Sequence, residues 1–387
     1  MSTAPLRSVT DLRLAGRRVF IRADLNVPLT KSGEVADDSR IRASQETLDW
    51  VRRAGGRVVL ASHLGRPKAA PDPKYSLAPV AKHMKLPLAP DCVGPEVEAA
   101  VSRLRDGEAI LLENLRFHAG EEKNDPAFVG QLAKLCDVYV NDAFGTAHRA
   151  HASTEGLARA VPESGAGFLL AREVQALSKV RDSPEHPYVC ILGGAKVSDK
   201  LKVLESLAAR ADTVVIGGAM AYTFLLAQGL PVGRSLVEPE LVETAKRLLA
   251  GKTELLLPVD HVVAGNPDDA AGARTVDRIP DDTMALDIGP RSRAAIEKRL
   301  GAARTVFWNG PLGFFEKPPF DAGTRAVAEM LARCAGYTVV GGGDSLAAVQ
   351  AAGVGDRIDH LSTGGGASLE FLEGAALPGV EALRGKR

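Results

Sequence analysis

The chain has 387 residues, of which 45% are hydrophobic and 5% aromatic, and its 48 basic side chains are matched by 48 acidic ones. This length exceeds one ordinary hydrophobic core and predicts two domains of a soluble α/β protein. The balanced charge gives no reason to expect nucleic acid or a membrane surface as a partner. Because the four cysteines form no CxxC pair and no run of 18 apolar residues occurs, we expect free thiols in a cytoplasmic protein.

The first half of the chain repeats a short apolar run followed by polar residues. These runs are Arg18–Arg22, Arg57–Leu60, Ala109–Leu112 and Val138–Val140. Short apolar runs separated by helical stretches predict a parallel sheet that is covered on both faces. Ligands bind such sheets outside the carboxyl ends of the strands.

Polar and basic side chains follow these runs closely. They are Asp24, Asn26, His63, Arg66, Arg116, His148 and Arg149, with Arg40 shortly after the first run. A single arginine after a strand is usually a solvated surface residue, but here three of the four runs supply one. We expect the guanidinium groups to converge on a small substrate that carries phosphate and carboxylate groups. His148 and His151 have no third metal ligand nearby, so positive charge or hydrogen bonding in this anion site is the better interpretation.

An amphipathic pattern from Gly167 to Val180 predicts one helix. The polar segment Asp182-Ser-Pro-Glu-His-Pro187 ends it, because two prolines cannot continue a helix. We place the domain boundary at this segment. It could act as a hinge or be a plain linker.

The second half opens with an apolar run, Tyr188–Leu192, followed by Gly193-Gly-Ala-Lys196-Val-Ser-Asp-Lys200. A helical pattern then begins at Val197, so backbone N–H groups and two ammonium groups four residues apart would face a polyanion such as nucleotide phosphates. The alternative is an ordinary strand-to-helix connection with two solvated lysines.

Other apolar runs of this half also end in glycines. They are Thr213–Ile216 before Gly217 and Gly218, Thr305–Trp308 before Asn309 and Gly310, Tyr337–Val340 before Gly341 to Gly343, and Leu361 before Gly364 to Gly366, with a further strand expected over Glu254–Asp260. Glycine-lined strand ends let backbone approach a flat base and a phosphate chain. Asp344, at a predicted helix start, could hold Mg²⁺ on phosphate oxygens or could be a plain N-cap. No GxGxxG follows any of the strands, which weakens the prediction of a dehydrogenase.

Seven of these strings occur in an order that is specific. They are Asp24-Leu-Asn26, His63-Leu-Gly-Arg66-Pro67, Leu115-Arg116-Phe117, Asp142-Ala-Phe-Gly-Thr-Ala-His-Arg149-Ala-His151, Gly193-Gly-Ala-Lys196-Val-Ser-Asp-Lys200, Trp308-Asn-Gly-Pro311 and Gly341-Gly-Gly-Asp344-Ser345. With them the chain resembles the phosphoglycerate kinase family, from about residue 8 to the final helix. The resemblance implies an α/β protein of two Rossmann-like three-layer (αβα) domains with mainly parallel sheets, joined by a helix and hinge, with a cleft between them.

The resemblance also implies the domain limits. Residues 1–166 would bind 3-phosphoglycerate, 167–187 would form the interdomain helix and hinge, 188–366 would bind the nucleotide, and 367–387 would pack back on the N-terminal domain. The family acts as a monomer, with Mg²⁺ as cofactor and ATP or ADP as co-substrate.

The resemblance assigns roles to individual residues. Substrate-binding residues would be Asp24, Leu25, Asn26, Arg40, His63, Leu64, Gly65, Arg66, Arg116 and Arg149. Nucleotide-binding residues would be Lys196, Lys200, Gly217, Gly218, Asn309, Leu312, Glu316, Gly342, Gly343, Asp344 and Ser345, with Glu316 on the ribose, Asp344 on Mg²⁺ and Ser345 capping a helix. Arg40, Lys196, Gly343 and Gly366 would be catalytic. Ala285 stands where many members have glycine near the adenine, which leaves that contact in doubt.

The implied reaction is reversible phosphoryl transfer between 1,3-bisphosphoglycerate and ADP, giving 3-phosphoglycerate and ATP. A carboxylate acceptor has no proton to remove at pH 7, so alignment and charge neutralisation are required rather than a general base. Two alternatives from other classes are a Rossmann-type oxidoreductase acting on a small acid and a non-catalytic nucleotide-binding scaffold.

Overall fold

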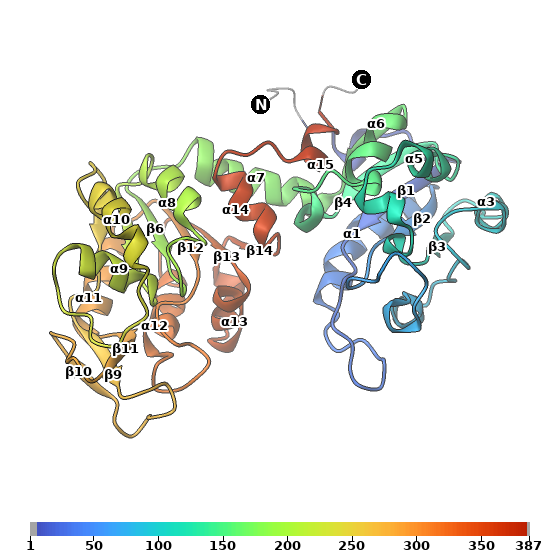
Figure 1. Ribbon diagram of the computed structural model, residues 1–387. Helices are drawn as coiled ribbons and strands as arrows, with labels where there is room; N and C mark the ends of the chain where they lie inside the picture. Colours follow the sequence, from blue (N-terminus) through green and yellow to red (C-terminus); the bar gives the residue numbers. More distant parts are fainter. Residues whose placement is uncertain (1–5, 385–387) are drawn as a thin grey trace. The chain divides into compact units, whose positions relative to one another are not determined.

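The computed structural model describes residues 6–384 (Figure 1). They form two compact units. Unit 1 takes in the chain up to Gln175 together with the segment from Ala376 onward, and unit 2 spans Ala176–Ala375. No helix in this described range is both long and apolar enough to cross a membrane.

Unit 1 is built on one sheet of five parallel strands in the order β3-β2-β1-β4-β5. Its strands are β1 (Arg18–Ala23), β2 (Arg57–Ala61), β3 (Ala109–Leu111), β4 (Val138–Asp142) and β5 (Glu163–Ala166). Its helices are α1 (Ser39–Arg53), α2 (Ala78–Met84), α3 (Pro95–Ser102), α4 (Ala119–Glu122), α5 (Pro126–Ala133), α6 (Leu157–Ala160), the first half of α7 (Phe168–Asp182) and α15 (Pro378–Glu381). The chain moves outward from β1 to β3 and then returns to the other side of β1, so the strand order reverses between β1 and β4.

Both faces of this sheet are buried, which is why the central residues of β1 to β4 are mostly apolar. Val19 and Ile21 of β1 belong to one hydrophobic cluster together with Leu48 of α1. Phe20, between them, points to the opposite face and stacks on Tyr139 of β4 with ring centroids 6.1 Å apart. Alternate residues of a strand face opposite sides, so helices must cover both.

Unit 2 holds a parallel sheet of six strands in the order β14-β13-β12-β6-β7-β8 and an antiparallel sheet of three strands in the order β10-β9-β11. Its strands are β6 (Tyr188–Leu192), β7 (Thr213–Ile216), β8 (Glu254–Leu256), β9 (His261–Ala264), β10 (Arg274–Val276), β11 (Met284–Ile288), β12 (Thr305–Asn309), β13 (Tyr337–Gly341) and β14 (His360–Ser362). Its helices are α8 (Leu201–Ala208), α9 (Met220–Ala227), α10 (Val242–Leu249), α11 (Pro290–Leu300), α12 (Ala322–Leu331), α13 (Gly343–Ala351) and α14 (Gly366–Leu372). The strand order reverses between β6 and β12, the place where ligands bind to doubly wound sheets.

The expected mainly parallel α/β architecture is confirmed in both units, with differences at the level of single elements. The strand predicted over Glu254–Asp260 is seen only over Glu254–Leu256, as β8, and the next strand, β9, begins at His261 in the other sheet. The antiparallel sheet escaped prediction because its strands are short and β10 is largely exposed, so their apolar pattern is weak. The helix predicted from Gly167 is α7, and unit 1 ends inside it, at Gln175.

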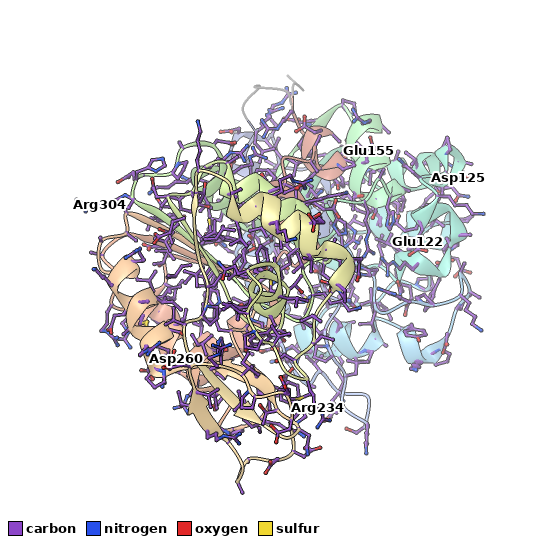
Figure 2. All side chains as sticks on the ribbon, turned by 60° about the vertical axis from the view of Figure 1, so that its left-hand side comes forward. Glu122, Asp125, Glu155, Arg234, Asp260 and Arg304 are labelled. Atoms are coloured by element: carbon purple, nitrogen blue, oxygen red, sulfur yellow. The ribbon has the colours of Figure 1, made fainter. Side chains whose placement is uncertain are left out.

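Buried charges in both units serve helix starts. The carboxylate of Asp142, at the end of β4, accepts hydrogen bonds from the backbone N–H groups of Leu169 (2.9 Å) and Leu170 (3.3 Å) at the start of α7. Asp260, labelled in Figure 2, accepts in the same way from Arg291 (2.9 Å) and Ser292 (2.8 Å) at the start of α11. A carboxylate at a helix N-terminus satisfies N–H groups that have no partner within the helix.

Exposed charges lie at the surface instead. Arg234 and Arg304, labelled in Figure 2, are both exposed in unit 2.

The C-terminal segment returns to unit 1 from Ala376, later than the expected residue 367. Helix α14 stays with unit 2, where the carbonyl of Leu372 accepts a hydrogen bond from Ser206 Oγ at 2.8 Å. In α15, the N–H of Gly379 donates to the carbonyl of Ala147 at 2.8 Å. A Cβ atom on Gly379 would lie 3.0 Å from Cα of Ala147, so any larger residue would push α15 away from Ala147.

We predict opposite effects of two glycine-to-alanine substitutions in helices of unit 1. Gly130→Ala in α5 meets open space and should raise the free energy of unfolding by up to about 1 kcal/mol, since alanine favours helix. Gly379→Ala should lower it by about 1 kcal/mol, because the methyl group pushes α15 away from Ala147. Urea unfolding of the full chain measures both. Equal stabilisation by the two substitutions would contradict the close packing of α15.

Candidate active site

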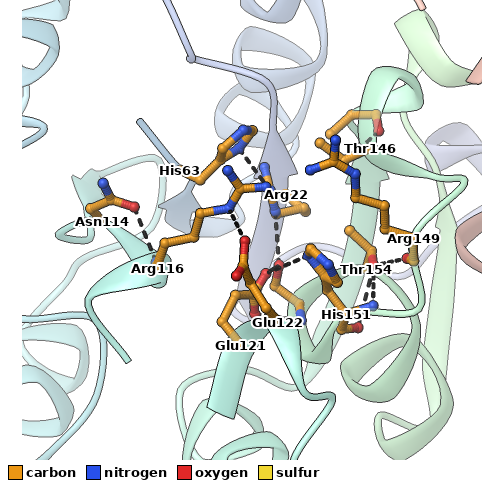
Figure 3. A network of polar contacts seen from close by, with 12 residues as sticks. Arg22, His63, Asn114, Arg116, Glu121, Glu122, Thr146, Arg149, His151 and Thr154 are labelled. Carbon is orange, nitrogen blue, oxygen red and sulfur yellow. Dashed lines mark hydrogen bonds and ion pairs between the residues drawn. The ribbon is translucent and has the colours of Figure 1, made fainter. Parts of the chain in front are cut away.

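A cluster of basic side chains gathers at the carboxyl ends of the unit 1 strands (Figure 3). Arg22 lies near the end of β1, His63 follows β2, Arg116 lies in the short helix Leu115–Phe117 after β3, and Arg149 follows β4. We call these four residues, with Arg40 of α1, the arginine cluster. The predicted convergence of strand-end arginines is thus seen for Arg116 and Arg149, and the charges of both reach His63.

Arg22 organises the centre of the arginine cluster although sequence reasoning did not select it. It is 1% exposed, donates from Nε to Ser153 Oγ at 2.9 Å, and contacts Nδ1 of His63 with Nη2 at 3.2 Å. A guanidinium can only donate, so Nδ1 of His63 must accept and the ring proton must sit on Nε2. The signal in the sequence that could have identified Arg22 was an arginine near the end of a mostly apolar strand.

His63 is held in its neutral form. Burial, followed by the charges of Arg22, Arg116, Arg149 and Arg40, lowers its pKa well below the usual value. His63 therefore presents an Nε2–H group as a hydrogen-bond donor. For His151, burial and then the charges of Arg116 and Arg22 lower the pKa to about 4, so hydrogen bonding rather than charge is its role here.

Two glutamates of α4 offset part of this positive charge. Glu122 pairs with Arg116, with Oε1 3.1 Å from Nε. Glu121 is 1% exposed and accepts hydrogen bonds from Oγ (2.6 Å) and the backbone N–H (3.0 Å) of Ser153. Burial raises the pKa of Glu121, and the charge of Arg22 opposes that shift. Neither glutamate was predicted as a site residue.

The strand-end loops of unit 1 are tied to one another by hydrogen bonds. Oδ1 of Asn26 accepts from the N–H of Gly65 at 2.8 Å, and Nη1 of Arg116 donates to the carbonyl of Gly65 at 2.8 Å. Oδ2 of Asp24 pairs with Nη1 of Arg40 at 2.8 Å. The N–H of Asn26 donates to Oδ1 of Asp24 at 3.3 Å, so these predicted residues form one connected group in which Asp24 orients Arg40.

The remaining predicted residues of unit 1 differ in exposure. Leu25 and Leu64 are buried in the same hydrophobic cluster as Val19 and Ile21. Their packing there fixes the backbone that carries the neighbouring polar residues. The side chain of Arg66, in the loop after β2, is exposed to solvent.

The strand-end loops of unit 2 pack tightly on one another, and this explains their glycines. A Cβ atom on Gly193 would lie 2.0 Å from the carbonyl oxygen of Pro311, and one on Gly217 would lie 2.1 Å from Cδ2 of Leu312. Gly218 adopts a φ of +67° and would meet the backbone of Gly194 at 2.6 Å. The glycines after β6 and β7 thus allow loop-on-loop contact, and Leu312 is the buried side chain beneath Gly217.

The helix expected to begin at Val197 begins later, so Lys196 and Lys200 do not share a helical face. Helix α8 begins only at Leu201, with Lys200 as its N-cap, and Lys196 lies in the preceding loop. Glu238 was not predicted as a site residue. Its carboxylate accepts hydrogen bonds from the backbone N–H groups of Val197 (2.5 Å) and Ser198 (3.1 Å) and so fixes the loop before α8.

Lys200 turns back onto the strand ends. Its Nζ donates to the carbonyl oxygens of Gly193 and, at 2.9 Å, of Asn309. Burial lowers its pKa to about 8, although the charge of Asp344 acts in the opposite sense. Lys196 is exposed, so its ammonium group is the more accessible of the two.

Helix α13 begins with an open N-terminus. Gly342 is its N-cap with a φ of +93°, and a Cβ on Gly343 would meet nothing within 4 Å. Gly366, at the start of α14, is equally open. Asp344 lies in the first turn of α13 with an exposed side chain, and it is not the N-cap.

Ser345 does not cap α13 as expected. Its buried Oγ accepts from the N–H of Gly310 at 2.6 Å and ties the loop after β12 to the helix. Asn309 is also buried, being 3% exposed at the end of β12. Both buried side chains therefore stabilise the strand-end loops of unit 2 from the interior.

A pocket of about 230 Å³ opens over these loops. Its lining is mostly apolar or backbone and consists of Gly194, Ala195, Gly218, Ala219, Tyr222, Ala285, Leu286, Pro311, Gly313, Phe314, Glu316 and Asp344. A small apolar pocket with two carboxylates at its border suits a flat base and a sugar, with phosphates toward the open helix start. Ala285, whose role was in doubt, is part of this lining.

Taken together, these features define a class: a doubly wound α/β protein with a guanidinium-rich cluster at the strand ends of one unit and a mostly apolar pocket at the strand ends of the other. The profile of the phosphoglycerate kinase family matches residues 9–375. The chain belongs to this family, as its motifs indicated.

Individual relatives agree over nearly the whole chain. The phosphoglycerate kinases of Solibacter usitatus and of Anaeromyxobacter sp. (strain K) are each 56% identical, covering 97% of this chain and 98% and 99% of theirs. The solved phosphoglycerate kinase structure from Coxiella burnetii has a TM-score of 0.90 at 40% identity, and the one from Pyrococcus horikoshii a TM-score of 0.83 at 33% identity. Both structures cover 98% of this chain, and they match 99% and 98% of their own. These comparisons give no support to an oxidoreductase or to a non-catalytic scaffold.

The neutral state of His151 predicts a pH dependence of stability. Its pKa of about 4 in the folded chain lies below the ordinary 6.5, so the unfolded chain binds the extra proton as pH falls. The stability that comes from neutral His151 is therefore fully present above pH 6.5 and is lost as the pH falls toward 4. His151→Gln should therefore reduce the loss of unfolding free energy between pH 7.5 and pH 5 by up to about 2 kcal/mol.

Urea unfolding at the two pH values measures this difference. His83→Gln is the control, because the side chain of His83 is 41% exposed and lies outside the arginine cluster. A His151→Gln chain with the unchanged pH dependence would contradict the buried neutral state.

Proposed function

We propose that the chain catalyses the reversible transfer of a phosphoryl group between 1,3-bisphosphoglycerate and ADP, with 3-phosphoglycerate and ATP as products and Mg²⁺ as cofactor. The observation that carries this proposal is the division of chemistry between the two units of a phosphoglycerate kinase family member. One unit gathers guanidinium groups, and the other offers a mostly apolar pocket with a glycine helix start.

The arginine cluster would hold the three-carbon acid. Arg116 and Arg149 would bind its phosphate, together with the exposed Arg66, since guanidinium groups match phosphate oxygens bidentately. The Nε2–H of His63 would add a donor that carries no charge. Asp24 and Asn26 would receive the hydroxyl and carboxyl end, where Asp24 also orients Arg40.

The pocket of unit 2 would hold the nucleotide. The base would lie against Tyr222 and Ala285, and the ribose hydroxyls would reach the exposed carboxylate of Glu316. Lys196 and Lys200 would face the phosphate chain, Lys200 after exchanging a carbonyl contact for a phosphate oxygen.

Asp344 fits the role of a magnesium ligand. Among residues 6–384 no hydrogen bond or ion pair engages its carboxylate, which is exposed and borders the pocket. Magnesium in kinase sites uses one or two carboxylates plus substrate phosphates. When bound, the ion would neutralise phosphate charge.

The rest of the chemistry would fall to the chain itself. The acceptor carboxylate needs no base, so the residues must align two anions and screen their repulsion. Arg40 and Lys196 would neutralise the phosphoryl group in transfer, and the N–H groups beginning α13 and α14, at Gly343 and Gly366, would donate to its oxygens. Closure of the two units on each other, in a cytoplasmic monomer, stays a prediction.

A coupled assay with 3-phosphoglycerate, ATP and Mg²⁺ tests the proposal, with EDTA as the negative arm. ATP consumption should require the acid and Mg²⁺. ATP consumption that does not depend on 3-phosphoglycerate would contradict the proposal. So would a change in NADH fluorescence when the chain is added without coupling enzymes, because that would indicate an oxidoreductase.

Arg40→Ala should lower turnover by about 10³-fold, the loss expected when an arginine that stabilises the transferring group is removed. Arg42→Ala is the matched control, because Arg42 lies on the same helix with a 69% exposed side chain that pairs with Asp38. Steady-state kinetics on both variants measures the difference. Equal turnover in the two variants would remove Arg40 from the mechanism.

Asp344→Asn should raise the Mg²⁺ concentration needed for half-maximal turnover by roughly 10-fold or more, because a neutral amide is a weaker ligand for a hard cation. Asp356→Asn, at an exposed position after α13, is the control. A Mg²⁺ titration of activity that is unchanged in Asp344→Asn would exclude the carboxylate as the ligand.

A further inference from the structure

Three metal-ligating side chains meet in unit 1 outside the arginine cluster. Asp91 and Cys92 lie in the segment before α3, and His118 is the N-cap of α4. The ligand atoms of these three residues all lie within 4.8 Å of one another. We call them the Asp–Cys–His group.

Two donors of this group point at one carboxylate. Nε2 of His118 lies 2.8 Å from Oδ1 and 3.1 Å from Oδ2 of Asp91, and the backbone N–H of Cys92 donates to Oδ1 of Asp91 at 2.6 Å. The imidazole is held in place by stacking on Phe128, with centroids 5.3 Å apart and planes 22° from parallel. The side-chain ligand atoms of the group therefore converge on one point.

The group is buried on one side and open on the other. Cys92 is 0% exposed, whereas the side chains of His118 and Asp91 are 33% and 41% exposed. An ion can thus enter from solvent and keep a water molecule as a further ligand. A three-ligand site with one open position is a common arrangement for zinc.

The ligand types select the metal. Thiolate and imidazole favour zinc-class ions over Mg²⁺ and Ca²⁺, which take oxygen ligands. One thiolate and one carboxylate balance the charge of a divalent ion, which lowers the free-energy cost of burying it partly. Tetrahedral bond lengths place zinc ligands about 3.3–3.8 Å apart, so side-chain movements on the order of 1 Å complete the site.

We propose that Asp91, Cys92 and His118 bind one zinc-class divalent cation, with water as the fourth ligand. On binding, Sγ of Cys92 releases its proton to solvent and Nε2 of His118 passes its hydrogen to Nδ1 through solvent. The thiol thus gives up one proton for each ion bound, the carboxylate and the imidazole bind through lone pairs, and no electron is transferred.

The site has a structural consequence near the arginine cluster. His118 comes two residues after Arg116, and a metal bond would tie this loop to the Asp91–Cys92 segment. Binding to the folded chain alone raises its stability, so the metal should raise the unfolding temperature.

Titration of the metal-free full chain with Co²⁺ alone tests the proposal, because cobalt replaces zinc and reports its ligands by absorption. We expect one Co²⁺ per chain, a near-ultraviolet band from thiolate-to-cobalt charge transfer, and loss of the band when Zn²⁺ is added. Cys92→Ser should abolish the band. His118→Gln and Asp91→Asn should weaken Co²⁺ binding by at least roughly 10-fold.

Two matched variants serve as controls. Cys136→Ser removes another buried cysteine of unit 1, and His186→Gln breaks a 2.7 Å His186–Asp212 pair that has no cysteine. Both should keep the band. Circular dichroism and kinase activity of every variant establish that it is folded.

The proposal fails if no thiolate band appears, if the band survives Cys92→Ser, or if Cys136→Ser removes it. It also fails if the exposed ligand variants, His118→Gln and Asp91→Asn, bind Co²⁺ as tightly as the original chain. Because a carboxylate such as Asp344 gives no thiolate band, this readout is independent of the proposed kinase function.

Discussion

Repulsion between like charges is the constraint on which the site of unit 1 depends. Three guanidinium groups and His63 share the strand ends, and without compensation they would push the loops apart. The structure offsets this in two ways: Glu121 and Glu122 supply nearby negative charge, and the histidines stay neutral. Positive charge remains in excess, so an anionic ligand completes the balance on a site that is already assembled.

Unit 2 meets a different constraint, which is that the proposed nucleotide site requires backbone to come close to the ligand. The loops after β6, β7 and β12 lie in direct contact, and Gly193, Gly217 and Gly218 have no room for a side chain. Gly343 and Gly366 differ, because open space surrounds them. The first kind of glycine builds the floor, and the second kind leaves helix starts accessible for phosphate oxygens.

Much of this could be predicted from sequence, because apolar runs and strand-end residues report directly on a parallel sheet. The arginines after β3 and β4 and the limits of most strands are seen where they were expected. What could not be predicted depends on contacts between distant segments. The roles of Arg22 and Glu121 come from a shared partner, Ser153, and the late start of α8 goes with the carboxylate of Glu238 holding the loop before it. Local periodicity carries no information on such pairs.

The central claim is that each unit binds one of the two reactants. Hydrogen exchange of the full chain, measured with 3-phosphoglycerate alone and with ADP alone, tests it most directly. The account predicts that the acid slows exchange in the loops after β1 to β4 and that ADP slows it in the loops after β6, β7, β12 and β13. Protection of the same unit by both ligands would contradict it.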